Sequence, residues 1–149
     1  YFFADIEAFF GFTDQNVSSV GEVTDIKNFD FTYNDITQNY ETKNIYFYVQ
    51  AFQGEPSSTY QWTVTLDGKV INETNSADTL SYNVKSSELP DGAELREANG
   101  EIEIEGALVI ENNNPEYQKG MVILSIPGDT VFDKNVSYKG TLKMKLEVK

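Results

Sequence analysis

Cysteine and histidine are both absent from this chain of 149 residues. Without cysteine the chain has no disulfide and no thiolate nucleophile, and it loses most ways of building a structural zinc site. Without histidine it lacks the usual proton shuttle near neutral pH, so acid–base catalysis would rest on carboxylates alone. Glu101 and Glu103 form such a pair, but they fall on the predicted solvent face of a strand, with no pocket beside them. We expect no enzymatic activity and no required cofactor.

Basic residues are also scarce: 11 Lys plus Arg stand against 24 Asp plus Glu, which gives a formal net charge of −13. This charge repels nucleic-acid phosphates and anionic lipid surfaces, so neither is an expected partner. No apolar run approaches the roughly 18 residues of a membrane-spanning helix. The chain begins at Tyr1 rather than Met, which suits a secreted protein whose signal peptide has been removed. We expect an extracellular or cell-surface location.

Alternation of apolar and polar residues with a period of two is what the chain has in abundance. It is typical of β-strands with one buried face, and it runs through residues 29–34, 45–52, 60–66, 80–84, 101–111 and 142–148. No long amphipathic helix is indicated. At this length the pattern predicts one all-β domain, a β-sandwich of jelly-roll or immunoglobulin-like type with about seven to nine antiparallel strands.

Three local predictions follow from the alternation. Asp67-Gly68 lies between segments 60–66 and 69–72 and predicts a two-residue hairpin turn. Trp62 alternates in phase with Val64 and Leu66, which places it in the core. The basic outer row of 142–148 and the acidic outer row of 101–111 predict that these two strands are neighbours.

The first eleven residues carry the most informative pattern. Every even position is apolar, so an extended strand would present five side chains on one side: Phe2, Ala4, Ile6, Ala8 and Phe10. We expect residues 1–11 to be a donor strand, residues 12–19 a polar tether and residues 20–149 the sandwich. Such a strand either starts its own domain or completes a neighbouring copy's sheet, and repeating the second step head to tail makes a filament. An amphipathic helix is a further alternative, because the aromatic residues also share one helical face.

The segments YFFAD at residues 1–5 and VGEVTDI at 20–26, with an acidic stretch and the polar tether between them, resemble the mature start of the TasA and camelysin group of biofilm-matrix fibre proteins. The plan is also similar to that of archaeal bundling pili and cannula subunits. The resemblance covers about the first 26 residues. It implies a β-sandwich that donates its strand, here Phe2 to Phe10, to the next subunit. We therefore expect a structural subunit of an extracellular filament whose partners are copies of itself.

A carbohydrate-binding or adhesive module of a cell-surface assembly is the alternative function. Exposed aromatic rings stack on sugars, and Tyr46, Tyr48 and Tyr60 are candidates for such a platform.

Two kinds of surface site are suggested by short motifs. Sequons for N-linked sugar occur at Asn16, Asn72 and Asn135. Asp129, Asp133 and Asn135 share one predicted loop and offer oxygen ligands of the kind that calcium prefers. Residues of these types are also common in turns, and we favour that role over a calcium site.

Overall fold

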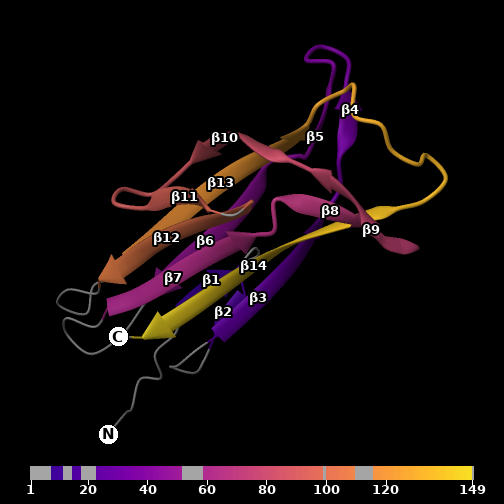
Figure 1. Cartoon of the computed structure of the whole chain (residues 1–149). Helices are drawn as coiled ribbons and strands as arrows, with labels where there is room; N and C mark the ends of the chain where they lie inside the picture. The colour runs from indigo at the N-terminus through magenta and orange to yellow at the C-terminus, as the bar shows by residue number, and fades with distance from the viewer. Residues whose placement is uncertain are drawn as a thin grey trace, which may run out of the picture.

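The computed structural model describes residues 8–11, 15–17, 23–51, 59–98, 100–109 and 116–148. In these residues all the regular structure is β-strand, arranged in two antiparallel sheets that pack as a sandwich (Figure 1). The all-β sandwich prediction is confirmed. The described residues form fourteen strands rather than seven to nine, because bends divide two long strands and because alternation does not reveal strands of three or four residues.

The first sheet has the order β2-β1-β6-β13-β5-β4. β5 and β6 follow one another along one edge of β13, while β10 pairs with the opposite edge. The outer edge of the β5–β6 line is covered by β4 beside β5 and by β1 beside β6. The strands are β1 (Ala8–Gly11), β2 (Gln15–Val17), β4 (Thr32–Asn34), β5 (Asn39–Glu41), β6 (Ile45–Ala51), β10 (Asn83–Glu88) and β13 (Glu116–Ile126).

The second sheet has the order β11-β12-β7-β14-β8-β9, with β3 on the other edge of β14. β14 is therefore central, and its 11 residues pair with three strands. The strands are β3 (Val23–Phe29), β7 (Thr59–Leu66), β8 (Lys69–Asn72), β9 (Asn75–Ser81), β11 (Glu94–Ala98), β12 (Glu101–Val109) and β14 (Tyr138–Val148).

The predicted hairpin at Asp67-Gly68 is wrong. β7 and β8 both pair with β14, in one continuous line, and do not pair with each other. Gly68 does have the positive φ expected of a turn, 75°, and a Cβ added there would lie 1.9 Å from the carbonyl oxygen of Gly100. The dipeptide bends the strand but does not reverse it, because β14 is long enough to pair on both sides of the bend.

The predicted contact between the acidic and basic rows is also wrong. β7 lies between β12 and β14, so that Thr65 stands opposite Glu103 on one side and Lys143 on the other. The ion pairs that form are more local: Arg96 binds Glu105 across the β11–β12 pair, and Lys145 binds Glu147 within β14 at 2.8 Å.

The core lies between the sheets and is centred on two aromatic rings, Phe47 of β6 and Trp62 of β7, whose centroids are 5.3 Å apart. Trp62 is 0 % exposed, which confirms its predicted burial. Each ring covers the glycine opposite it in the neighbouring strand. A Cβ on Gly120 would lie 1.9 Å from the Phe47 ring, and one on Gly106 would lie 2.1 Å from the Trp62 ring. These glycines provide the room that the two large rings need.

We predict that Gly106→Ala lowers the free energy of unfolding by about 1–3 kcal/mol, the usual cost of overpacking a core. Chemical denaturation followed by Trp62 fluorescence measures the change. Ala107→Val adds bulk at the next residue, on the exposed side of the same strand, and should change stability by less than about 0.5 kcal/mol. An unchanged denaturation midpoint for Gly106→Ala would contradict the packing described above.

Candidate functional site

The outer edge of β6 is covered by the N-terminal strand of the same chain. β1 runs antiparallel to β6, with Ala8 opposite Ala51 and Gly11 opposite Tyr48. β2 in turn pairs with β1, with Ala8 opposite Val17. Residues 15–17 of the expected tether are therefore paired as a strand.

This edge lies directly beside the core. Phe47 and Val49 of β6 are each 1 % exposed, and Phe10 stands opposite Val49 in the register. An uncovered β6 would present unpaired backbone N–H and C=O groups next to these buried side chains. The strand that pairs with β6 therefore completes both the sheet and the margin of the core.

The residues predicted to form the donor strand are only partly described. Phe2, Ala4 and Ile6 lie outside the described residues. Ala8 and Phe10 lie in β1 and pair within their own chain. The edge of β6 is thus covered by a strand of its own chain. Donation to a neighbour stays a prediction.

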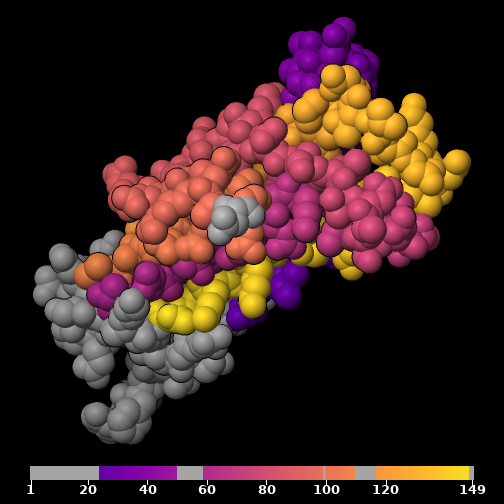
Figure 2. Space-filling model, in the orientation of Figure 1, coloured from indigo at the N-terminus to yellow at the C-terminus, as the bar shows by residue number. Residues whose placement is uncertain are grey.

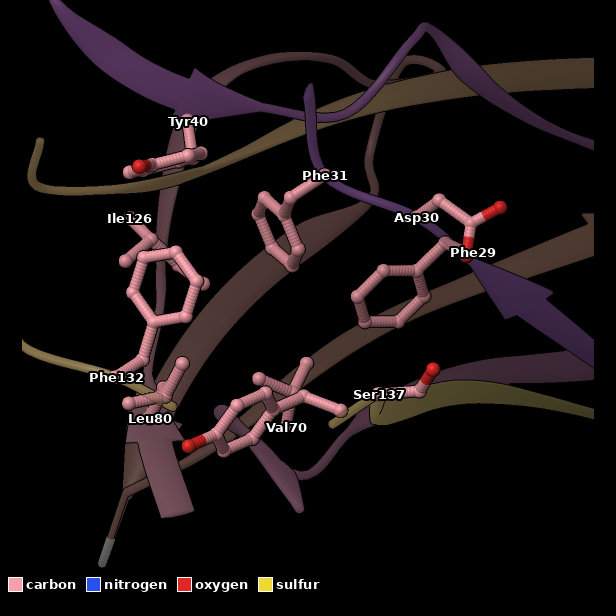
Figure 3. A pocket seen from close by; sticks show the side chains of 10 residues that line it. Phe29, Asp30, Phe31, Tyr40, Val70, Leu80, Ile126, Phe132 and Ser137 are labelled. Atoms are coloured by element: carbon pink, nitrogen blue, oxygen red, sulfur yellow. The ribbon is translucent and has the colours of Figure 1, made fainter. Parts of the chain in front are cut away.

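A second feature is a cavity of about 250 Å³ at the end of the sandwich where β13 ends at Ile126 and β14 begins at Tyr138 (Figure 3). We call this end of the sandwich the far end. The opposite end, where β1 begins, is called the near end. Alternation within strands gave no sign of the cavity, because its walls come from segments that are far apart in the sequence. It is lined by Phe29, Asp30, Phe31, Tyr40, Val70, Leu80, Ile126, Phe132, Ser137 and Tyr138.

Edge-to-face contacts hold the aromatic walls of this cavity. Phe29 packs on Phe31 with ring centroids 5.6 Å apart, and Phe132 packs on Tyr40 at 5.4 Å and on Tyr138 at 6.2 Å. The Tyr138 hydroxyl donates a 2.6 Å hydrogen bond to Asp78 and accepts one from the backbone N–H of Asp133. The hydrogen bond between Tyr138 and Asp78 lowers the pKa of the Asp78 carboxyl and raises the pKa of the Tyr138 phenol. These contacts hold loop 127–137 beside the cavity.

The aromatic platform predicted for sugar binding is not assembled as expected. Tyr60 is 2 % exposed and belongs to the core, in the same phase as Trp62. Tyr46 and Tyr48 do stack, with centroids 6.4 Å apart. The ammonium group of Lys119 lies 4.5 Å from the Tyr46 centroid and 5.6 Å from that of Tyr48, so a cation already occupies a face of the pair.

The three sequons differ in their surroundings. Asn72 is 5 % exposed; its amide nitrogen donates to Asp78 at 3.0 Å, and its oxygen accepts from Thr74. A sugar on that nitrogen would displace the hydrogen bond to Asp78. Asn135 lies exposed on loop 127–137. The side chain of Asn16 is not among those that the structure describes.

The residues considered for calcium act as a turn. Asp129, Asp133 and Asn135 are all exposed, and the Asp133 carboxylate accepts a 2.9 Å hydrogen bond from the backbone N–H of Asn135. Within the described ranges, no group of three or more His, Cys, Asp or Glu side chains is placed to hold a metal ion. The same ranges contain no helix of the length and apolarity that crossing a bilayer takes.

Comparison of the chain with protein-family models, with curated proteins and with solved structures gives no match. Only the geometry of this chain therefore bears on its function.

A buried carboxylate fixes the β4–β5 hairpin at the far end of the sandwich. Glu41 accepts hydrogen bonds from Asn34 at 3.0 Å and Thr37 at 2.8 Å, and it pairs with Lys85 at 2.9 Å. Lys85 sits at the bulge of β10, so the pair connects β5 to the opposite edge of the sheet. Lys85 first, then Thr37 and Asn34, lower the pKa of Glu41.

We predict that the stabilising effect of Glu41 depends on pH. Because its pKa is lowered on folding, its contribution is present above the ordinary Glu pKa of about 4.3 and is lost as the pH falls through the folded-state pKa. Glu41→Gln should therefore lower the denaturation midpoint near neutral pH and approach wild type in acid. Glu88→Gln is the control because Glu88 is exposed on the same strand as Lys85. Equal losses for Glu41→Gln at both pH values would contradict the prediction.

Proposed function

We propose that this protein is a secreted structural subunit of an extracellular filament, with no catalytic role and no required cofactor. Copies would join when residues 1–11 of one copy take the place of β1 on β6 of the next. The pairing of β1 with the outer edge of β6 is the observation that supports this proposal. β1 is the first described segment of the chain, and residues 12–22, which include the short strand β2, connect it to β3.

Exchange of this strand keeps the pairing of β6 unchanged. The same backbone hydrogen bonds form whether β1 comes from the same chain or from another copy, which is why swapping of identical elements is a low-cost route to assembly. The swap is heterologous, since the donor segment and the acceptor edge are different surfaces. Repetition of such a contact without closure gives an open filament.

The link between β1 and the sandwich is long enough for the exchange. Gly11, the last residue of β1, stands opposite Tyr48. The distance from Tyr48 along β6 and β5 to Tyr40, at the far end, is about 27 Å. Residues 12–22, when extended, join Gly11 to Val23 over at most about 40 Å. A copy placed with its near end against its neighbour's far end would supply β1 in the same direction, antiparallel to β6.

A cysteine pair across the β1–β6 register tests the exchange. Phe9 stands opposite Gln50, and because the chain contains no cysteine, Phe9→Cys with Gln50→Cys creates the only possible disulfide. Directly opposed strand residues lie within disulfide range. We expect a ladder of covalent oligomers on non-reducing gels after assembly, and fibres in electron micrographs of the wild type.

Gln50→Cys alone is the matched control and should give nothing larger than a dimer. An intramolecular disulfide in every chain, under conditions where fibres are seen, would show that β1 stays in its own subunit and would contradict strand exchange. A chain that stays monomeric at all concentrations would contradict the filament proposal itself.

A further inference from the structure

The far end of the molecule has the shape and chemistry of a receptor for an aromatic side chain. Its cavity of about 250 Å³ is lined mainly by five aromatic rings and by Val70, Leu80 and Ile126, with Asp30 and Ser137 as its other polar lining residues. An apolar cavity of about 150 Å³ is already large enough to admit benzene. Two apolar side chains stand exposed at the same end among charged ones: Ile36 in the β4–β5 turn at 93 % and Val131 in loop 127–137 at 92 %. Figure 2 shows both segments at this end, in indigo and in orange to yellow.

The chain carries matching side chains at its opposite end. Phe2 and Phe3 precede β1 in the sequence. β1 begins at Ala8, which pairs with Ala51 at the end of β6. Ala51 pairs on its other side with Glu116, the first residue of β13. Ala8 therefore lies at the near end, and residues 1–7 precede it in the sequence. The cavity begins at the other end of β13, beside Ile126.

Residues 1–7 are too short to fill the cavity of their own chain. From Glu116 to Ile126, β13 extends about 34 Å. Seven extended residues span at most about 23–25 Å. When β1 is paired with a β6 strand, Phe2 and Phe3 therefore cannot reach the far-end cavity of the molecule to which that β6 belongs.

We infer that the far-end cavity binds the Phe2-Phe3 segment of a second copy of this chain. In a head-to-tail pair, the near end of one copy meets the far end of the next, and the aromatic rings of the segment enter between Phe31 and Phe132. The rings would meet the walls edge to face, as the wall residues already meet one another. The inference rests on the proposed head-to-tail assembly but not on strand exchange, because Ala8, which follows residues 1–7, lies at a near end whether β1 is swapped or not.

The test uses a fluorescent peptide with the sequence of residues 1–7 and the full chain carrying Phe2→Ser and Phe3→Ser. Fluorescence anisotropy measures binding of the peptide to this chain. Adding Ser137→Phe fills the cavity from an exposed lining residue. Asn135→Phe is the matched control: it adds the same side chain to the same loop outside the lining, and both changes remove the same sequon. We expect Ser137→Phe to weaken peptide binding about ten- to a hundredfold, the loss expected for one buried phenylalanine, and Asn135→Phe to leave it unchanged.

Absence of peptide binding, or equal binding to all three chains, would overturn the inference. The two proposals fail separately. If wild type and the Ser137→Phe single variant form fibres at the same protein concentration, the filament stands and the cavity contact is refuted. If the peptide binds as expected but the full chain forms no fibres, the contact stands and the filament function is refuted.

Discussion

A sheet edge that lies beside buried side chains has to be covered, and the long β5–β6 line meets this requirement in two different ways. β4 covers β5 as part of a tight hairpin whose turn is held by Asn34 and Glu41. β1 covers β6 through a link of eleven residues that includes the short strand β2. The first cover is fixed to its own chain, because a four-residue turn cannot reach another molecule. The second has the length to be supplied by a neighbour.

The two ends of the sandwich differ in a way that gives the molecule a direction. The near end holds the start of β1, and the far end holds the aromatic cavity together with Ile36 and Val131. Contacts between unlike surfaces favour open assemblies over closed dimers. The net charge of −13 opposes any association, but charges more than about 8–10 Å apart are largely screened at physiological salt. Apolar contacts at the ends are therefore compatible with a net negative charge.

Alternation predicted the strands and the phase of their side chains well. In β7 every second residue is buried, as the sequence of residues 60–66 indicates, and this placed Trp62 correctly. The same phase buries Tyr60. The alternation of residues 60–66 therefore already indicated that Tyr60 could not belong to an exposed sugar-binding platform. Alternation does not say which strands pair. The bend at Gly68 and the separation of β12 from β14 by β7 depend on the length of β14 and on sheet order, which no local window contains.

The far-end cavity lay beyond sequence reasoning for a related reason. Phe29 and Phe31 lie in one alternating segment, but Tyr40, Phe132 and Tyr138 lie outside the alternating segments, and no local window shows that the five rings meet. Only the folded chain brings them around one space. An apolar side chain that entered this cavity would gain dispersion contacts with the aromatic rings around it. In the proposed assembly this gain would add to the exchange of β1, which keeps its pairing with β6 but gives up its pairing with β2 when the link is extended.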